Sequence, residues 1–145
     1  MSVISRRSNI AASSIPGTVQ RARVTLTSAQ ILALHSTPVT LLPAPGAGQY
    51  ISVQEVLAKG PAAGGTAYTG ANNVEIRYTD GSGNKVTSDL AAAWLNSQTS
   101  RVDRATAADV TTVANAPVVA VVPTANPAAG TLPVQFDILY RVVSI

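Results

Sequence analysis

The chain contains no cysteine and a single histidine. The absence of cysteine excludes disulfide scaffolds, thiolate metal sites and cysteine nucleophiles. The histidine, His35, is the only imidazole that could act as a base in a serine hydrolase, and no Gly-x-Ser-x-Gly motif accompanies it. We expect His35 at the C-terminal end of a short helix or on the surface, because an imidazolium interacts favourably with the free carbonyls at a helix end.

Charged residues are also scarce, at 12% of the chain, which is about half their share in an average soluble protein. A surface with so little charge is expected to be covered in part by a partner. A glycosidase needs two carboxylates at a set separation. The acidic residues are instead expected on exposed strand faces or in turns: Glu55, Glu75, Asp80, Asp89, Asp103, Asp109 and Asp137.

The glycine-rich segments lack the residues that would make them ligand loops. Residues 44–50 have no Lys-Ser/Thr pair for a phosphate-binding loop and lead into a strand instead of a helix. Residues 80–84 have no further acidic ligands for a calcium loop and are typical of a hairpin turn. The sequence therefore predicts a protein that is not an enzyme and that uses no metal or cofactor.

Long apolar runs are missing as well. No apolar stretch approaches the roughly 18 residues of a membrane span. The early arginines in "MSVISRRSNI" are not followed by the apolar core of a signal peptide. We therefore expect a protein that is made in the cytoplasm and has no membrane partner.

The net charge of +3 is distributed unevenly. The first 23 residues contain four arginines and no acid, whereas the remaining residues have six basic against seven acidic side chains. This predicts an extended basic arm over residues 1–23 and a nearly neutral domain over residues 24–145. Such an arm could be a solubilising tail, could bind nucleic acid, or could dock on another protein subunit. Its arginines are Arg6, Arg7, Arg21 and Arg23.

The first part of the predicted domain contains a helix, a strand and a corner. Thr27 and Gln30 have the spacing of a capping box, which predicts a helix over residues 28–34. The β-branched run at residues 39–42 is a short strand that must end at the prolines that follow it. Residues 43–48, rich in proline and glycine, form a corner between this strand and the next one, in the same or a different sheet.

The rest of the domain is dominated by strand patterns. Residues 50–57, 74–79 and 132–142 alternate apolar and polar side chains, and residues 118–123 form an unbroken β-branched run typical of a central strand. Glu75 and Arg77 are expected to point outward. The pattern around Trp94 fits a short helix or a buried irregular strand. The side chains expected to point inward are Ile51, Val53, Leu57, Val74, Ile76, Tyr78, Leu132, Phe136, Ile138 and Tyr140.

Several short strands separated by turn-rich loops predict an all-β sandwich or barrel with one or two short helices. Residues 26–80, together with the ending "LPVQFDILYRVV", resemble the small capsid cement or decoration proteins of tailed bacteriophages, of the kind found on short-tailed Bordetella phages. The resemblance implies a jelly-roll β-sandwich on the outer surface of the virion capsid. It also implies that the protein cements neighbouring major capsid subunits against the pressure of packaged DNA.

The resemblance further implies the partners of the chain. These are the major capsid protein and other copies of the chain itself. A homodimer is the first expectation and a homotrimer the second. No direct contact with nucleic acid is expected. Capsid contacts are expected at Arg6, Arg7, Arg21 and Arg23. Two other classes stay open: a tail or fibre protein that binds a host receptor through the glycine-rich loops around Tyr68, and a small hydrolase that depends on His35.

Overall fold

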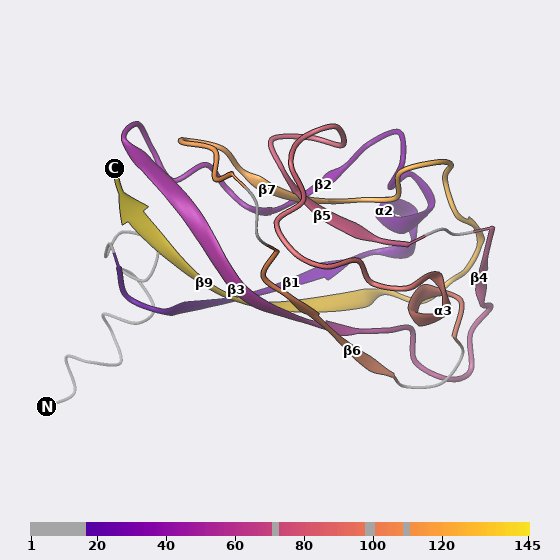
Figure 1. Cartoon of the computed structure of the whole chain (residues 1–145). Coiled ribbons are helices and arrows are strands. Elements are labelled where there is room, and N and C mark those ends of the chain that lie inside the picture. Colours follow the sequence, from indigo (N-terminus) through magenta and orange to yellow (C-terminus); the bar gives the residue numbers. More distant parts are fainter. Residues whose placement is uncertain (1–16, 71–72, 98–100, 109–110) are drawn as a thin grey trace, which may run out of the picture.

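The computed structural model describes residues 17–70, 73–97, 101–108 and 111–145. In these residues, antiparallel strands form two main sheets that face each other (Figure 1). The all-β sandwich predicted from the sequence is confirmed. The four-stranded sheet has the order β1 (Gln20–Leu26), β9 (Val134–Ser144), β3 (Gln49–Lys59) and β6 (Val102–Thr106). The three-stranded sheet has the order β2 (Val39–Leu42), β7 (Val118–Val121) and β5 (Glu75–Tyr78).

Two short helices, two short strands and one segment that forms only isolated bridges complete the described part. The helices α2 (Ser28–Leu32) and α3 (Ala92–Leu95) are short, and β4 (Tyr68–Thr69) pairs with β8 (Ala128–Ala129). Residues 85–90 run beside β5 through isolated bridges. A jelly roll has eight complete strands, whereas residues 85–90 form only isolated bridges and no full strand. The sandwich is confirmed, and its jelly-roll topology stays a prediction.

The core lies between the two sheets. Along β9 the side chains alternate as predicted, and Phe136, Ile138 and Tyr140 are buried. Trp94 of α3 packs against Phe136 with ring centroids 5.5 Å apart and donates its indole N–H to the Ala58 carbonyl at 2.8 Å. Leu132 was expected to point into this core and is only half-buried, because it precedes β9.

A β-bulge in β3 overturns the prediction for Leu57. Opposite β9, Val53 pairs with Tyr140 and Glu55 pairs with Leu139, so that Gln54 is an extra residue. Side chains in a strand alternate between its two faces, and one extra residue reverses the alternation beyond it. Val56 and Ala58 therefore enter the core, and Leu57 lies half-buried on the opposite face.

The predicted start of the helix and the predicted corner are both confirmed. In α2, Thr27 Oγ1 accepts a hydrogen bond from the Gln30 N–H at 3.3 Å, and Gln30 Oε1 accepts one from the Thr27 N–H at 2.9 Å. The helix ends at Leu32, two residues before the predicted end. The corner takes the chain from β2 in one sheet to β3 in the other, with Gly46 and Gly48 both at positive φ.

The predicted boundary between arm and domain falls inside β1. This strand begins at Gln20, and its pairing with β9 runs without interruption from Gln20 opposite Tyr140 to Leu26 opposite Val134. Residues 20–23 are thus part of the four-stranded sheet. Residues 1–16 lie outside the described part of the chain, and an arm there remains a prediction. Within the described ranges, no helix has the length and apolar character needed to cross a membrane.

Candidate interaction surface

One face of the four-stranded sheet points away from the core, and we call it the outer sheet face. Its side chains are exposed or half-buried, and the strand pairing sets Arg23, Asp137, Leu57 and Arg104 side by side across all four strands. The outer sheet face consists of Arg21, Arg23, Thr25, Tyr50, Ser52, Glu55, Leu57, Lys59, Val102, Arg104, Thr106, Gln135, Asp137, Leu139, Arg141 and Val143.

Two of the predicted contact arginines, Arg21 and Arg23, meet on this face at Asp137. Arg23 forms two hydrogen bonds to the carboxylate, at 2.8 and 3.1 Å, and Arg21 forms one at 2.8 Å. The two Arg23 hydrogen bonds, together with the one from Arg21, lower the pKa of Asp137 from 3.8 to about 2. The arginine side chains nevertheless remain 59% and 62% exposed. Arg6 and Arg7 lie outside the described residues.

The outer sheet face also holds three cations that the sequence did not single out. Arg104 pairs with Glu55 at 2.7 Å. Lys59 and Arg141 form no ion pair with any carboxylate in the part of the chain that the structure describes. The face thus carries five basic against two acidic side chains, a net charge of +3, whereas the other described residues carry three basic against four acidic ones.

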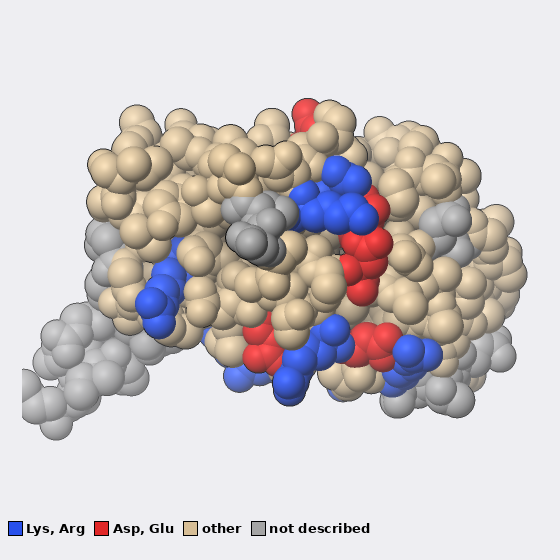
Figure 2. Space-filling view, viewed as in Figure 1, with Lys and Arg blue, Asp and Glu red and all other residues tan. Residues whose placement is uncertain are grey.

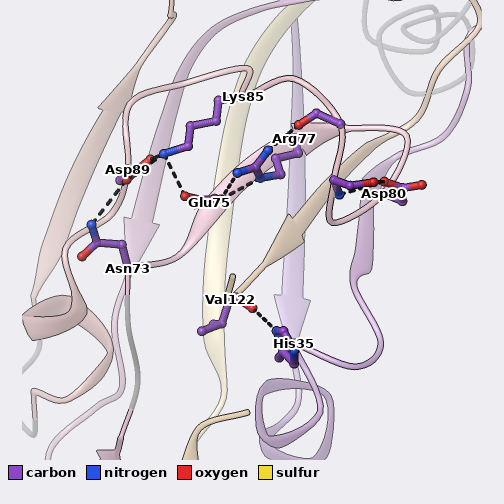
Figure 3. Close-up of polar contacts among 10 residues, drawn as sticks. His35, Asn73, Glu75, Arg77, Asp80, Lys85, Asp89 and Val122 are labelled. Atoms are coloured by element: carbon purple, nitrogen blue, oxygen red, sulfur yellow. Dashed lines mark hydrogen bonds and ion pairs between the residues drawn. The ribbon is translucent and has the colours of Figure 1, made fainter. Parts of the chain in front are cut away.

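A second charged cluster lies on the outside of the three-stranded sheet and is closely neutralised (Figure 3). Glu75 was expected to be exposed and is only 5% accessible. Its carboxylate accepts a hydrogen bond from Arg77 at 2.6 Å and pairs with Lys85 at 2.8 Å, while Lys85 also contacts Asp89 at 3.0 Å. The hydrogen bond from Lys85 to Glu75 and, to a smaller extent, the one to Asp89 raise the pKa of Lys85. The carboxylate is buried because the segment at 85–90 brings Lys85 over it.

Figure 2 shows how the two charged groups are separated on the surface. Charged side chains form a central group over β5 and a row along the lower side of the view, beneath β3 and β6. The upper part, over β2 and β7, is almost free of charge in this view. In this view most of the charge therefore lies in these two groups, with single charged side chains at the left and at the top.

The contacts of His35 connect two segments of the fold. Its Nδ1 lies 2.8 Å from the Val122 carbonyl oxygen (Figure 3). Its backbone N–H donates to Asn126 Oδ1 at 2.8 Å. These contacts hold the end of the α2 region against the strand-end loop after β7, and the side chain is exposed as expected. Among the described residues, no three His, Asp or Glu side chains are grouped so that they could hold a metal ion.

Tyr68 does not form an exposed loop tip. It is only 1% accessible, and its hydroxyl donates to the Leu132 carbonyl at 2.6 Å. The glycine-rich loop around it therefore uses this tyrosine to pack against the start of β9. The receptor-binding alternative loses the aromatic side chain on which it depended.

Comparisons with known proteins place this fold among phage capsid structures. No protein-family model and no curated protein matches the chain. A chain in the capsid of Ralstonia phage GP4 is 18% identical, with a TM-score of 0.53 over 88% of this chain and 86% of that one. A chain in the cyanophage Pam1 capsid asymmetric unit is 17% identical, with a TM-score of 0.50 over 88% and 87%. The chain thus shares its fold, over most of its length, with chains from two bacteriophage capsids.

Proposed function

We propose that this chain is a structural protein of a bacteriophage capsid. The observation that carries the proposal is the shared fold, because chains from two phage capsid structures match 88% of this chain and most of their own length. The low share of charged residues, 12%, suits a protein whose surface is partly covered by its neighbours. The resemblance of residues 26–80 to phage cement proteins points in the same direction.

Within the capsid, the proposed role is that of a cement protein. The chain binds the outer surface of the shell and bridges neighbouring major capsid subunits, so that the head resists the pressure of packaged DNA. Many copies act together on one shell, and avidity can compensate for weak individual contacts. Arg21 and Arg23 are available for such contacts because both are more than half exposed despite their pairing with Asp137. Arg6 and Arg7 complete the proposed contact set.

The test is to add the purified protein to expanded shells of its phage that lack it and to count bound copies by mass after sedimentation. A cement protein saturates at a fixed ratio to the major capsid protein and raises the temperature at which the shells break. Absence of binding would contradict the proposal. Immunogold labelling of complete particles provides a second readout, because label on the tail would favour the receptor-binding alternative.

The same material tests the proposed self-association. Placement on a symmetric shell favours symmetric contacts between copies, and a homodimer is the first expectation and a homotrimer the second. The mass of the free protein, measured by sedimentation equilibrium, distinguishes the two. A strictly monomeric protein at the concentrations used for binding would contradict both.

A further inference from the structure

The outer sheet face combines unneutralised positive charge with exposed apolar side chains. The large hydrophobic side chains that are exposed among the described residues are Val19, Val102 and Ile145, at 50%, 59% and 80% accessibility. Val102 lies in β6 on this face. Val19 directly precedes β1 and Ile145 directly follows β9, and the alternation of these strands continues onto the same face. Apolar and cationic side chains together on one face are typical of a protein interface.

A hollow in this face gives the surface a specific shape. Its volume is about 280 Å³, and all four strands of the sheet contribute to it. Arg23 of β1 and Lys59 of β3 bring positive charge to the hollow from either side of β9, and Leu57 and Val102 provide apolar walls. The residues that line it are Arg23, Leu57, Lys59, Val102, Gln135 and Asp137.

The charge in the hollow that has no counterion among the described residues is the ammonium group of Lys59. The carboxylate of Asp137 is already engaged by Arg21 and Arg23, and Lys59 forms no ion pair with a described carboxylate. An occupant that neutralises Lys59 and also contacts the apolar walls needs an apolar stem with a negative end. A glutamate side chain has this shape, and an aspartate has a shorter version of it.

We infer that the outer sheet face is the surface through which the chain docks on its partner, and that the hollow receives a glutamate or aspartate side chain of that partner at Lys59. The occupant is thus an acidic, partly apolar protein surface. A protein surface is favoured over a nucleic acid because the apolar side chains of Leu57 and Val102 line the hollow and suit an apolar stem better than a phosphate backbone. The inference rests on the proposed function, since the partner is taken to be the major capsid protein.

Carbodiimide cross-linking on saturated shells tests the inference. This reagent joins an amine to a carboxylate in direct contact, with loss of water. The chain has only two lysines, Lys59 and Lys85. We expect Lys59 to become linked to a capsid glutamate or aspartate only on shells. Lys85, which contacts Glu75 and Asp89 within the chain, should form the same internal links with and without shells.

Three variants control the experiment. Lys59→Arg keeps the charge, so it should bind the shell as wild type does while losing the cross-link. Lys59→Gln and Thr40→Glu each lower the net charge by one, but Thr40 is exposed on the outside of the three-stranded sheet. Lys59→Gln should weaken binding up to about fivefold, as loss of one exposed ion pair does, and Thr40→Glu should leave it unchanged.

The outcomes separate the inference from the proposed function. A chain that binds shells while Lys59 stays as reactive toward an amine reagent as in the free protein would overturn the inference and leave the proposed function standing. Protection of Lys59 on shells without a link to a capsid carboxylate would also overturn it, in favour of a different occupant. A chain that does not bind shells would overturn the proposed function and the inference with it.

Discussion

The two charged regions of this molecule use similar side chains in opposite ways. Around Glu75, the cations of Arg77 and Lys85 surround a nearly inaccessible carboxylate, and Asp89 balances the remaining charge. On the outer sheet face, Asp137 is shared by two exposed arginines, and Lys59 has no carboxylate partner among the described residues. Buried and balanced charges contribute to folding, whereas exposed and unbalanced ones are available to a partner. The distinction can be tested by mutation.

The largest effect is expected from deletion of residues 1–23. This deletion removes the whole predicted arm and with it part of β1, because residues 20–23 pair with β9 through the register that sets Gln20 opposite Tyr140. Loss of several ladder hydrogen bonds should lower the free energy of unfolding by roughly 2–5 kcal/mol, measured by urea denaturation. Deletion of residues 1–16 keeps β1 complete and removes Arg6 and Arg7, so it is the variant that tests the arm in shell binding. Equal stability of the 1–23 deletion and the intact chain would contradict the structural role of β1.

Replacement of Glu75 by alanine should have the next largest effect. It leaves the largely covered guanidinium of Arg77 and the ammonium of Lys85 without their shared carboxylate. Breaking a buried ion pair from one side costs about 3 kcal/mol, which chemical denaturation can measure. Shell binding per folded molecule should not change. A loss of stability below about 1 kcal/mol would show that this cluster is not a structural one.

A smaller, pH-dependent effect is expected at Asp137. Its pKa is lowered to about 2 in the folded chain from an ordinary value of 3.8. A lowered folded-state pKa stabilises the fold above the unfolded value, and this stabilisation is lost as the pH falls from about 4 to 2. Because the pair is largely exposed to solvent, we expect about 1 kcal/mol. Asp137→Asn should remove this part of the pH dependence, and unchanged acid denaturation curves would contradict the assignment.

The smallest effect is expected from Glu55→Ala, which is the counterpart of the Glu75 variant on the other face. Glu55 pairs with Arg104, whose side chain is mostly exposed. An exposed pair of this kind contributes roughly 0.5 kcal/mol or less. The unfolding transition should therefore stay nearly where it is in the wild type. A loss comparable with that of the Glu75 variant would erase the difference between the two regions.

The strand pattern of the sequence was sufficient to predict the sandwich, because period-two alternation in residues 132–142 and the β-branched run at 118–123 correspond directly to β9 and β7. The capping box at Thr27 could also be predicted from the sequence, since it depends only on local spacing. Arg21 and Arg23 were selected from their charge, but their assignment to an arm did not foresee strand pairing with β9, 114 residues or more away along the chain.

The wrong prediction that Glu75 is exposed and the omission of Lys59 have a common cause, which is packing between segments that are distant in the sequence. The alternation around Glu75 correctly predicted an outward side chain, but outward does not mean exposed when the segment carrying Lys85 runs alongside. Lys59 was not selected because the alternation predicted from the sequence ended at Leu57, and its uninterrupted continuation would have placed Lys59 on the same face as Ile51. Only the pairing of β3 with β9 reveals the extra residue that changes this.

The β-bulge at Gln54 acts as a phase shift in β3. Before it, the odd-numbered residues Ile51 and Val53 face the core, and after it the even-numbered Val56 and Ala58 do. Deletion of Gln54 would leave these faces as they are, because Val53 opposite Tyr140 and Glu55 opposite Leu139 would then be neighbours in a regular ladder. A strand that kept Gln54 in a regular ladder would instead turn Glu55, Leu57 and Lys59 toward the core, so the bulge is what allows this sequence to keep two charged side chains of β3 at the surface.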